Sequence, residues 1–84
     1  MPTVLVIDGY KFKFFSNEND EPAHVHVFKG KGKAKIWLRP SIKIEYSYSF
    51  TVREGRDIRF LVKGNYKALT GAWDEFFRQK SKNF

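Results

Sequence analysis

The stretch AHVHVFKGKGKAKIWL at residues 23–38 decides the fold of this chain. Apolar and polar side chains alternate on both sides of its glycine-containing centre, which is the period of two that a β-strand gives to its side chains. Gly30 and Gly32 lie at that centre, where glycine marks a turn. The stretch therefore predicts an antiparallel hairpin with strands at 23–28 and 33–38.

The register of this hairpin decides which side chains share a face, because a slip of one residue would exchange the two faces. With Phe28 opposite Lys33, one face is apolar and the other polar. The apolar face then holds Val25, Val27, Ala34, Ile36 and Leu38, and the polar face holds His24, His26, Lys33, Lys35 and Trp37. The alternative register puts both histidines and Phe28 on the side of Ala34, Ile36 and Leu38, so we expect the first.

Three further strands are predicted around the hairpin. Residues 4–7 and 10–15 are rich in β-branched and aromatic side chains and are joined by Asp8-Gly9, a strong signal for a tight turn between paired strands. The polar segment 16–22 is predicted to be a loop, and residues 42–49 are predicted to form a fifth strand. The same alternation adds to the apolar face Tyr10, Phe12, Phe14, Ile42, Ile44, Tyr46 and Tyr48.

Two helices are predicted after residue 50. Thr51 and Glu54 have the spacing of a capping box, which begins a helix at 52–63 that ends at Gly64. The apolar positions that fit one side of this helix are Val52, Ile58, Leu61 and Val62. A second helix is predicted at 66–79, where apolar side chains recur at helical spacing at Leu69, Ala72, Trp73 and Phe76. Residues 80–84 are expected to fray.

The predicted fold is α+β, with an N-terminal antiparallel sheet of four to five strands followed by two C-terminal helices that pack on one of its faces. The chain has 84 residues, so we expect residues 1–84 to form a single domain. Its nine Phe, four Tyr and two Trp supply the burial that so small a core needs.

Composition and motifs exclude several classes of function. There is no cysteine, so neither disulfides nor a thiolate zinc site is available. The chain lacks the glycine-rich phosphate loops, the dinucleotide fingerprint and the nucleophile elbow, so we predict no cofactor. The first nine residues lack the features of a secretory signal peptide, and no stretch is long and apolar enough to span a membrane. We therefore expect a cytoplasmic protein without a membrane partner.

Sixteen Lys and Arg against nine Asp and Glu give a net charge of +7, which favours an anionic partner. The sheet face that the helices leave uncovered is predicted to carry much of this charge, with one indole among the basic side chains. The predicted residues of this face are Lys11, Lys13, His24, His26, Lys33, Lys35, Trp37 and Lys43. A basic sheet with an aromatic platform is how several single-strand binders hold phosphates and stack bases. A second basic surface is predicted on the first helix, with Arg53, Arg56, Arg59 and Lys63, and we expect Arg53 and Arg56 to bind nucleic acid together with the sheet face. The alternative for both surfaces is a solvated face without a ligand.

His24 and His26 are the candidate catalytic residues, because two imidazoles two residues apart on one strand point the same way. In a ribonuclease-type activity, one would act as general base on a ribose 2′-hydroxyl and the other as general acid. A metal site would need a third protein ligand, for which only the acidic loop offers carboxylates, so we predict no metal. The remaining alternative is a structural pair that orders this loop through hydrogen bonds.

Four short motifs resemble a known family when their order and spacing are taken together. They are FFSNE at 14–18, PAHVHV at 22–27, AKIWLRP at 34–40 and AWDEF at 72–76. In this combination the chain resembles the small bacterial family catalogued as domain of unknown function 4160, over nearly its whole length. A departure lies at 54–56, where this chain has Glu-Gly-Arg and the family tends to have Glu-Leu-Arg. Gly55 costs the helix about 1 kcal/mol relative to Ala.

The resemblance implies no enzyme class. Members are often encoded beside a second small protein, and this pairing implies a toxin–antitoxin module with a cognate antitoxin-like partner protein and an RNA target. We therefore expect a small basic component of a bacterial two-protein module, acting as the toxin, that contacts RNA through the basic sheet face. The alternative is a non-enzymatic module that docks an acidic partner protein through the same charges. The oligomeric state is not predicted.

Overall fold

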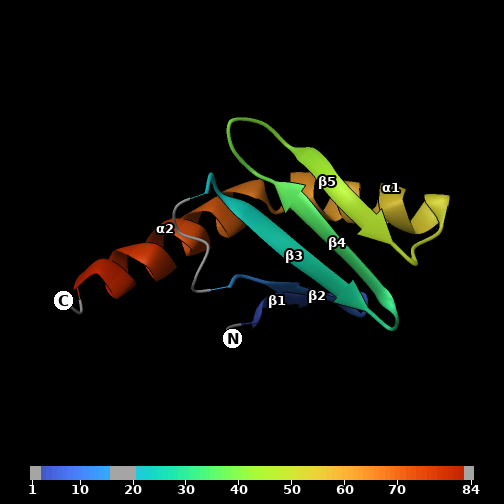
Figure 1. The fold of residues 1–84 in the computed structure, drawn as a ribbon, viewed down its shortest axis with the longest axis horizontal. Coiled ribbons are helices and arrows are strands. Elements are labelled where there is room, and N and C mark those ends of the chain that lie inside the picture. Colours follow the sequence, from blue (N-terminus) through green and yellow to red (C-terminus); the bar gives the residue numbers. More distant parts are fainter. Residues whose placement is uncertain (1–2, 16–20, 83–84) are drawn as a thin grey trace.

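The fold is an antiparallel sheet backed by two helices, as given by a computed structural model that describes residues 3–15 and 21–82. The five strands stand in the sheet in their sequence order: β1 (Thr3–Ile7), β2 (Tyr10–Lys13), β3 (His24–Lys29), β4 (Gly32–Trp37) and β5 (Lys43–Tyr48). The helices α1 (Val52–Gly64) and α2 (Tyr66–Lys82) follow. The α+β fold predicted from the sequence is confirmed (Figure 1).

The two hairpins have the predicted pairing. Phe28 of β3 lies opposite Lys33 of β4, and Val25 lies opposite Ile36. In the turn between β1 and β2, residues 8 and 9 both have positive φ, 52° and 82°, as the two-residue turns that best match strand twist require. The alternation along β2, β3 and β4 therefore separates an apolar face from a polar one.

The predicted faces are wrong for the second half of β5. Ile44 lies opposite Ile36 and Tyr46 lies opposite Lys35, so two residues advance along β5 while one advances along β4. Such a β-bulge moves the side chains that follow it to the other face. Tyr46 and Tyr48 therefore lie on the same face as Lys35, and not on the apolar face.

The helix α1 begins with the predicted capping box. The backbone N–H of Glu54 donates to Thr51 Oγ1 at 3.1 Å, and Glu54 Oε1 accepts from the backbone N–H of Thr51 at 2.9 Å. Ile58 and Val62 are buried, as predicted. Val52, predicted on the same side, is instead 77 % exposed. The reason is its spacing, since a position six residues before Ile58 lies about 120° from it around a helix axis.

The helix α2 packs on the sheet through large side chains. Leu69, Trp73 and Phe77 are buried, and Phe76, which was predicted with them, packs partly buried against the same core. The helix continues to Lys82, beyond the predicted end at residue 79. Of the predicted tail at 80–84, residues 83–84 lie outside the described part of the chain.

Two polar contacts tie α2 to the end of β4. The Tyr66 hydroxyl donates to the backbone oxygen of Leu38 at 2.6 Å. Arg39 donates from Nη1 and Nη2 to the two carboxylate oxygens of Asp74, at 2.7 and 2.8 Å. These hydrogen bonds from Arg39 hold the pKa of Asp74 below its ordinary value. The contacts fix the position at which α2 passes the end of the sheet.

Both helices lie on one face of the sheet (Figure 1), and we call the other the open face. The core between helices and sheet contains Phe12, Phe14, Val25, Val27, Ile36, Leu38, Ile58, Val62, Leu69 and Trp73. The prediction that both helices pack on one face is confirmed. No helix in residues 3–15 and 21–82 is long and apolar enough to cross a membrane.

Gly32 lies directly under the ring of Phe50, and a Cβ at this position would overlap three atoms of that ring. Gly32→Ala is expected to lower the free energy of unfolding by about 1–3 kcal/mol, as overpacking does in other cores. Gly55→Ala is the matched control, because open space surrounds Gly55 and Ala favours a helix interior by about 1 kcal/mol. Urea unfolding of both variants measures the two effects. A Gly32→Ala variant as stable as the parent would show that the Phe50 ring moves aside without cost.

Candidate nucleic-acid interface

The open face carries its lysines and rings in rows that run across the strands. Residues paired directly across neighbouring strands point to the same face, so the register identifies the neighbours. The first row contains Lys11, Phe28, Lys33 and Tyr48; the second contains Lys13, His26, Lys35 and Tyr46; the third contains His24, Trp37 and Lys43. We call these three rows the open-face rows. In the first two of them, every ring stands next to a lysine.

The rings of Tyr46 and Tyr48 stand side by side in these rows, Tyr48 exposed and Tyr46 partly buried. They stack with centroids 5.1 Å apart and planes inclined by 25°, and Tyr48 is 56 % exposed. Lys33 Nζ lies 5.7 Å from the Tyr48 ring centroid, within the roughly 6 Å range of cation–π attraction. Sequence reasoning missed both tyrosines, because the bulge leaves no break in the alternation of residues 42–48.

Trp37 is partly buried and is held on two sides. Lys35 Nζ lies 4.5 Å from the indole centroid, and the indole Nε1 donates to Glu45 Oε2 at 3.0 Å. Lys35 also forms an ion pair with Glu21 at 2.7 Å. Its charge is therefore partly compensated. Trp37 is the one indole of the open-face rows, as predicted, and the rings of Tyr46 and Tyr48 stand on the same face.

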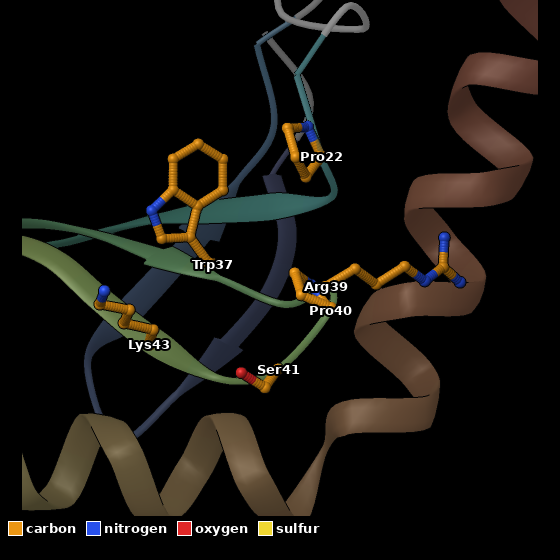
Figure 2. A pocket seen from close by; sticks show the side chains of 6 residues that line it. All are labelled: Pro22, Trp37, Arg39, Pro40, Ser41 and Lys43. Carbon is orange, nitrogen blue, oxygen red and sulfur yellow. The ribbon is translucent and has the colours of Figure 1, made fainter.

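An open hollow of about 390 Å³ lies beside Trp37 at the end of the sheet (Figure 2). Its walls are formed by Pro22, Trp37, Arg39, Pro40, Ser41 and Lys43. The Arg39 side chain extends toward α2 (Figure 2), where its guanidinium is bound by Asp74. The hollow thus combines the flat surfaces of an indole and two prolines with the ammonium group of Lys43.

The prediction that His24 and His26 lie on an uncovered surface is wrong. His24 has no exposed surface, and His26 is 6 % exposed. The ring of Phe15 meets His26 edge-on at 4.3 Å, and the ring of Trp73 from α2 lies 5.0 Å from His24. His24 Nδ1 donates to the backbone oxygen of Pro22 at 2.9 Å. A carbonyl only accepts hydrogen bonds, so Nδ1 carries a proton.

The two imidazoles pack against each other and against the open-face rows. Their ring centroids lie 5.2 Å apart, and His24 lies 5.3 Å from Trp37. In the described part of the chain, no three His, Asp or Glu side chains are grouped so that they could hold a metal ion. The geometry of the pair is that of packed rings that support Trp37.

The other lysines predicted for this face differ in exposure. Lys11, Lys33 and Lys43 are exposed, whereas Lys13 is partly buried. Lys13 Nζ lies 5.5 Å from the centroid of the Phe28 ring. The exposed cations stand on β2, β4 and β5, so they flank the rings on both sides.

Arg53 and Arg56 do not belong to this surface. Both are exposed on α1, whose buried residues Ile58 and Val62 face the sheet. The structure therefore places them on the far side of the helix layer and does not bring them together with the lysines of the open face. Within residues 3–15 and 21–82, the open face and α1 therefore carry separate basic surfaces.

Comparison with known proteins gives a match to a family model. Residues 9–74 match the model of the family described as "Domain of unknown function (DUF4160)". No curated protein and no solved structure matches the chain. The matched range begins at the turn before β2 and ends within α2, so it includes all the open-face rows.

Proposed function

The chain belongs to the domain of unknown function 4160 family, and from that premise we propose that it binds single-stranded RNA through the open-face rows. One observation carries the proposal: Trp37, Tyr46 and Tyr48 lie on neighbouring strands with Lys33 and Lys43 beside them. Single-strand binders stack bases on such rings and pair phosphates with such cations. The net charge of +7 adds long-range attraction for RNA.

The accessible path for RNA lies along β5. This strand is at the edge of the sheet, and neither helix covers its open face (Figure 1). A strand of RNA that follows β5 would meet the stacked rings of Tyr48 and Tyr46 and then the hollow beside Trp37. Rings stack any base, so we propose binding with little sequence preference. Duplex RNA shows no base faces and would lose this stacking.

The proposal assigns no catalytic step to His24 or His26. A general base must come within about 3 Å of the proton that it removes, and the burial of both imidazoles keeps a ribose hydroxyl farther away. A toxin in a two-protein module, which the family resemblance implies, would then act by holding RNA rather than by cutting it.

A labelled single-stranded RNA of about ten nucleotides, a length within the usual site sizes, should bind with an affinity that falls steeply with KCl concentration. Each phosphate contact contributes about −0.7 to the slope of log K against log salt, so Lys33→Ala and Lys43→Ala should each reduce its magnitude by about 0.7. Fluorescence anisotropy at several KCl concentrations measures this slope.

The matched control is Lys67→Ala, which removes an exposed lysine from α2 and should leave the slope unchanged. A duplex of the same sequence should bind more weakly than the single strand. No binding at low salt, or an equal loss in the Lys67→Ala variant, would contradict the proposal.

A further inference from the structure

The side of α1 that faces away from the sheet presents large apolar side chains. Val52 is 77 % exposed and Phe60 is 76 % exposed. The helix turns Ile58 and Val62 to the core, and Phe60 lies about 160° from Ile58 around the helix axis. Phe60 therefore lies on the side of the helix opposite its buried residues and stays largely in solvent, although burial of such a ring is normally favourable by about 1.5–3 kcal/mol.

Cations surround this ring. Lys63, Arg56 and Arg53 stand three, four and seven residues from Phe60, the spacings that place side chains together on one side of a helix. All three are exposed, and within residues 3–15 and 21–82 none of them forms an ion pair. We call Val52, Arg53, Arg56, Phe60 and Lys63 the outer face of α1.

One acidic side chain limits this surface on one side. Asp57 lines a hollow next to the turn between β1 and β2, together with Phe60 and Leu61 of α1, Asp8 of the turn, and Tyr10 and Lys29 of the sheet. The other acid of α1, Glu54, is engaged in the capping box. The positive charge of the outer face therefore lies on the side of Arg53, Arg56 and Lys63, away from this hollow.

We infer that the outer face of α1 docks an acidic segment of a partner protein, with apolar side chains of that segment around Phe60. Aromatic residues and Arg contribute most of the binding energy at protein interfaces. This face offers one ring, with two arginines four and seven residues before it on the same helix. The unpaired cations are complementary to carboxylates of the partner.

Two other occupants fit less well. A single ring on a convex helix gives no row on which successive bases stack, so RNA would gain only phosphate contacts. A second copy of the chain would meet the same patch across a two-fold axis and bring Arg53, Arg56 and Lys63 toward their own copies. Like charges across an interface disfavour such a dimer.

The inference does not rest on RNA binding. The helix α1 and the open face lie on opposite sides of the sheet (Figure 1), so a partner bound to the outer face of α1 leaves the open face accessible. The two proposals therefore fail or succeed in separate measurements.

The test is a titration of the full isotope-labelled chain with a synthetic amphipathic peptide, monitored through backbone amide shifts. The peptide is about four helical turns long, with Leu on one side and Glu on the other. We expect shift changes centred on residues 52–63. Phe60→Ser should weaken binding by about 5- to 30-fold, as the loss of an aromatic anchor does, and the Arg53→Glu, Arg56→Glu double variant should weaken it further.

Two controls accompany this titration. Val6→Ser removes an apolar side chain that is 58 % exposed on β1 and should leave the affinity unchanged. The same peptide with Lys in place of Glu should not bind. Phe60→Ser should also keep the affinity of the parent for single-stranded RNA.

Four results would overturn the inference. These are absence of binding by the Glu peptide, shift changes confined to the open face, an affinity that Phe60→Ser leaves unchanged, and a dimer in light scattering that Phe60→Ser converts to a monomer. The last result would assign the surface to a second copy of the chain. A fifth result, a loss of RNA affinity in Phe60→Ser, would overturn the inference by assigning the surface to RNA.

Discussion

Trp73→Ala is expected to lower the free energy of unfolding by about 3–5 kcal/mol, the largest loss that we expect from a single substitution in this chain. Trp73 is 7 % exposed, and its ring centroid lies 5.3 Å from Phe14, 5.0 Å from His24 and 4.2 Å from Phe77. It therefore joins α2 both to the core and to the start of β3. Small domains have a total stability of about 5–15 kcal/mol, so the variant should be largely unfolded on modest heating.

Thermal unfolding followed by circular dichroism measures this loss. Phe60→Ala is the matched control on the other helix, because the Phe60 ring is 76 % exposed and its removal should change the melting temperature little. A Trp73→Ala variant that melts within a few degrees of the parent would show that α2 contributes little to the core.

The Tyr46→Thr, Tyr48→Thr double variant is expected to bind single-stranded RNA at least about 30-fold more weakly than the parent. Stacking of a base on an aromatic side chain contributes about 1–3 kcal/mol, and the variant loses two such positions. Threonine keeps the preference for a strand, so the sheet should remain folded. Anisotropy with the same labelled RNA at low and high KCl measures the loss.

The dependence on salt separates stacking from charge. The loss in the double tyrosine variant should persist at high KCl, whereas the loss in Lys33→Ala should shrink as salt screens the phosphate contacts. Tyr48→Phe keeps the ring and should bind as the parent does. If Tyr48→Phe binds as weakly as Tyr48→Thr, then the hydroxyl rather than the ring makes the contact, and the stacking proposal is wrong.

Much of the fold could be predicted because local signals and long-range pairing agree. The glycines at 30 and 32 and the alternation around them determined the register of β3 and β4, and the spacing of Thr51 and Glu54 determined the start of α1. In each case the sequence separation is short, so one motif contains both partners of the interaction. The contacts of Arg39 with Asp74, which are 35 residues apart, had no such signal.

The candidate site was predicted only in part, because surface exposure depends on what covers a strand. The alternation along β3 places His24 and His26 on the open face, as predicted. Phe15 and Trp73 cover them, and the sequence of β3 alone does not indicate where these two residues lie. In the sequence, Tyr46 and Tyr48 continue the alternation that begins at Ile42 and Ile44. In the structure, one extra residue of β5 in the pairing with β4 moves both tyrosines to the other face. Whether these residues bind RNA stays a prediction.

The bulge makes one position of β5 different from all others in the strand. Loss of Glu45, the extra residue between Ile44 and Tyr46, would restore regular pairing and leave Tyr46 opposite Lys35. Both phenol rings would then stay on the open face, because adjacent residues of a regular strand point to opposite faces. Loss of Ser47 would instead turn Tyr48 to the apolar face. We therefore expect evolution and engineering to tolerate a shorter β5 at the bulge better than between the two tyrosines.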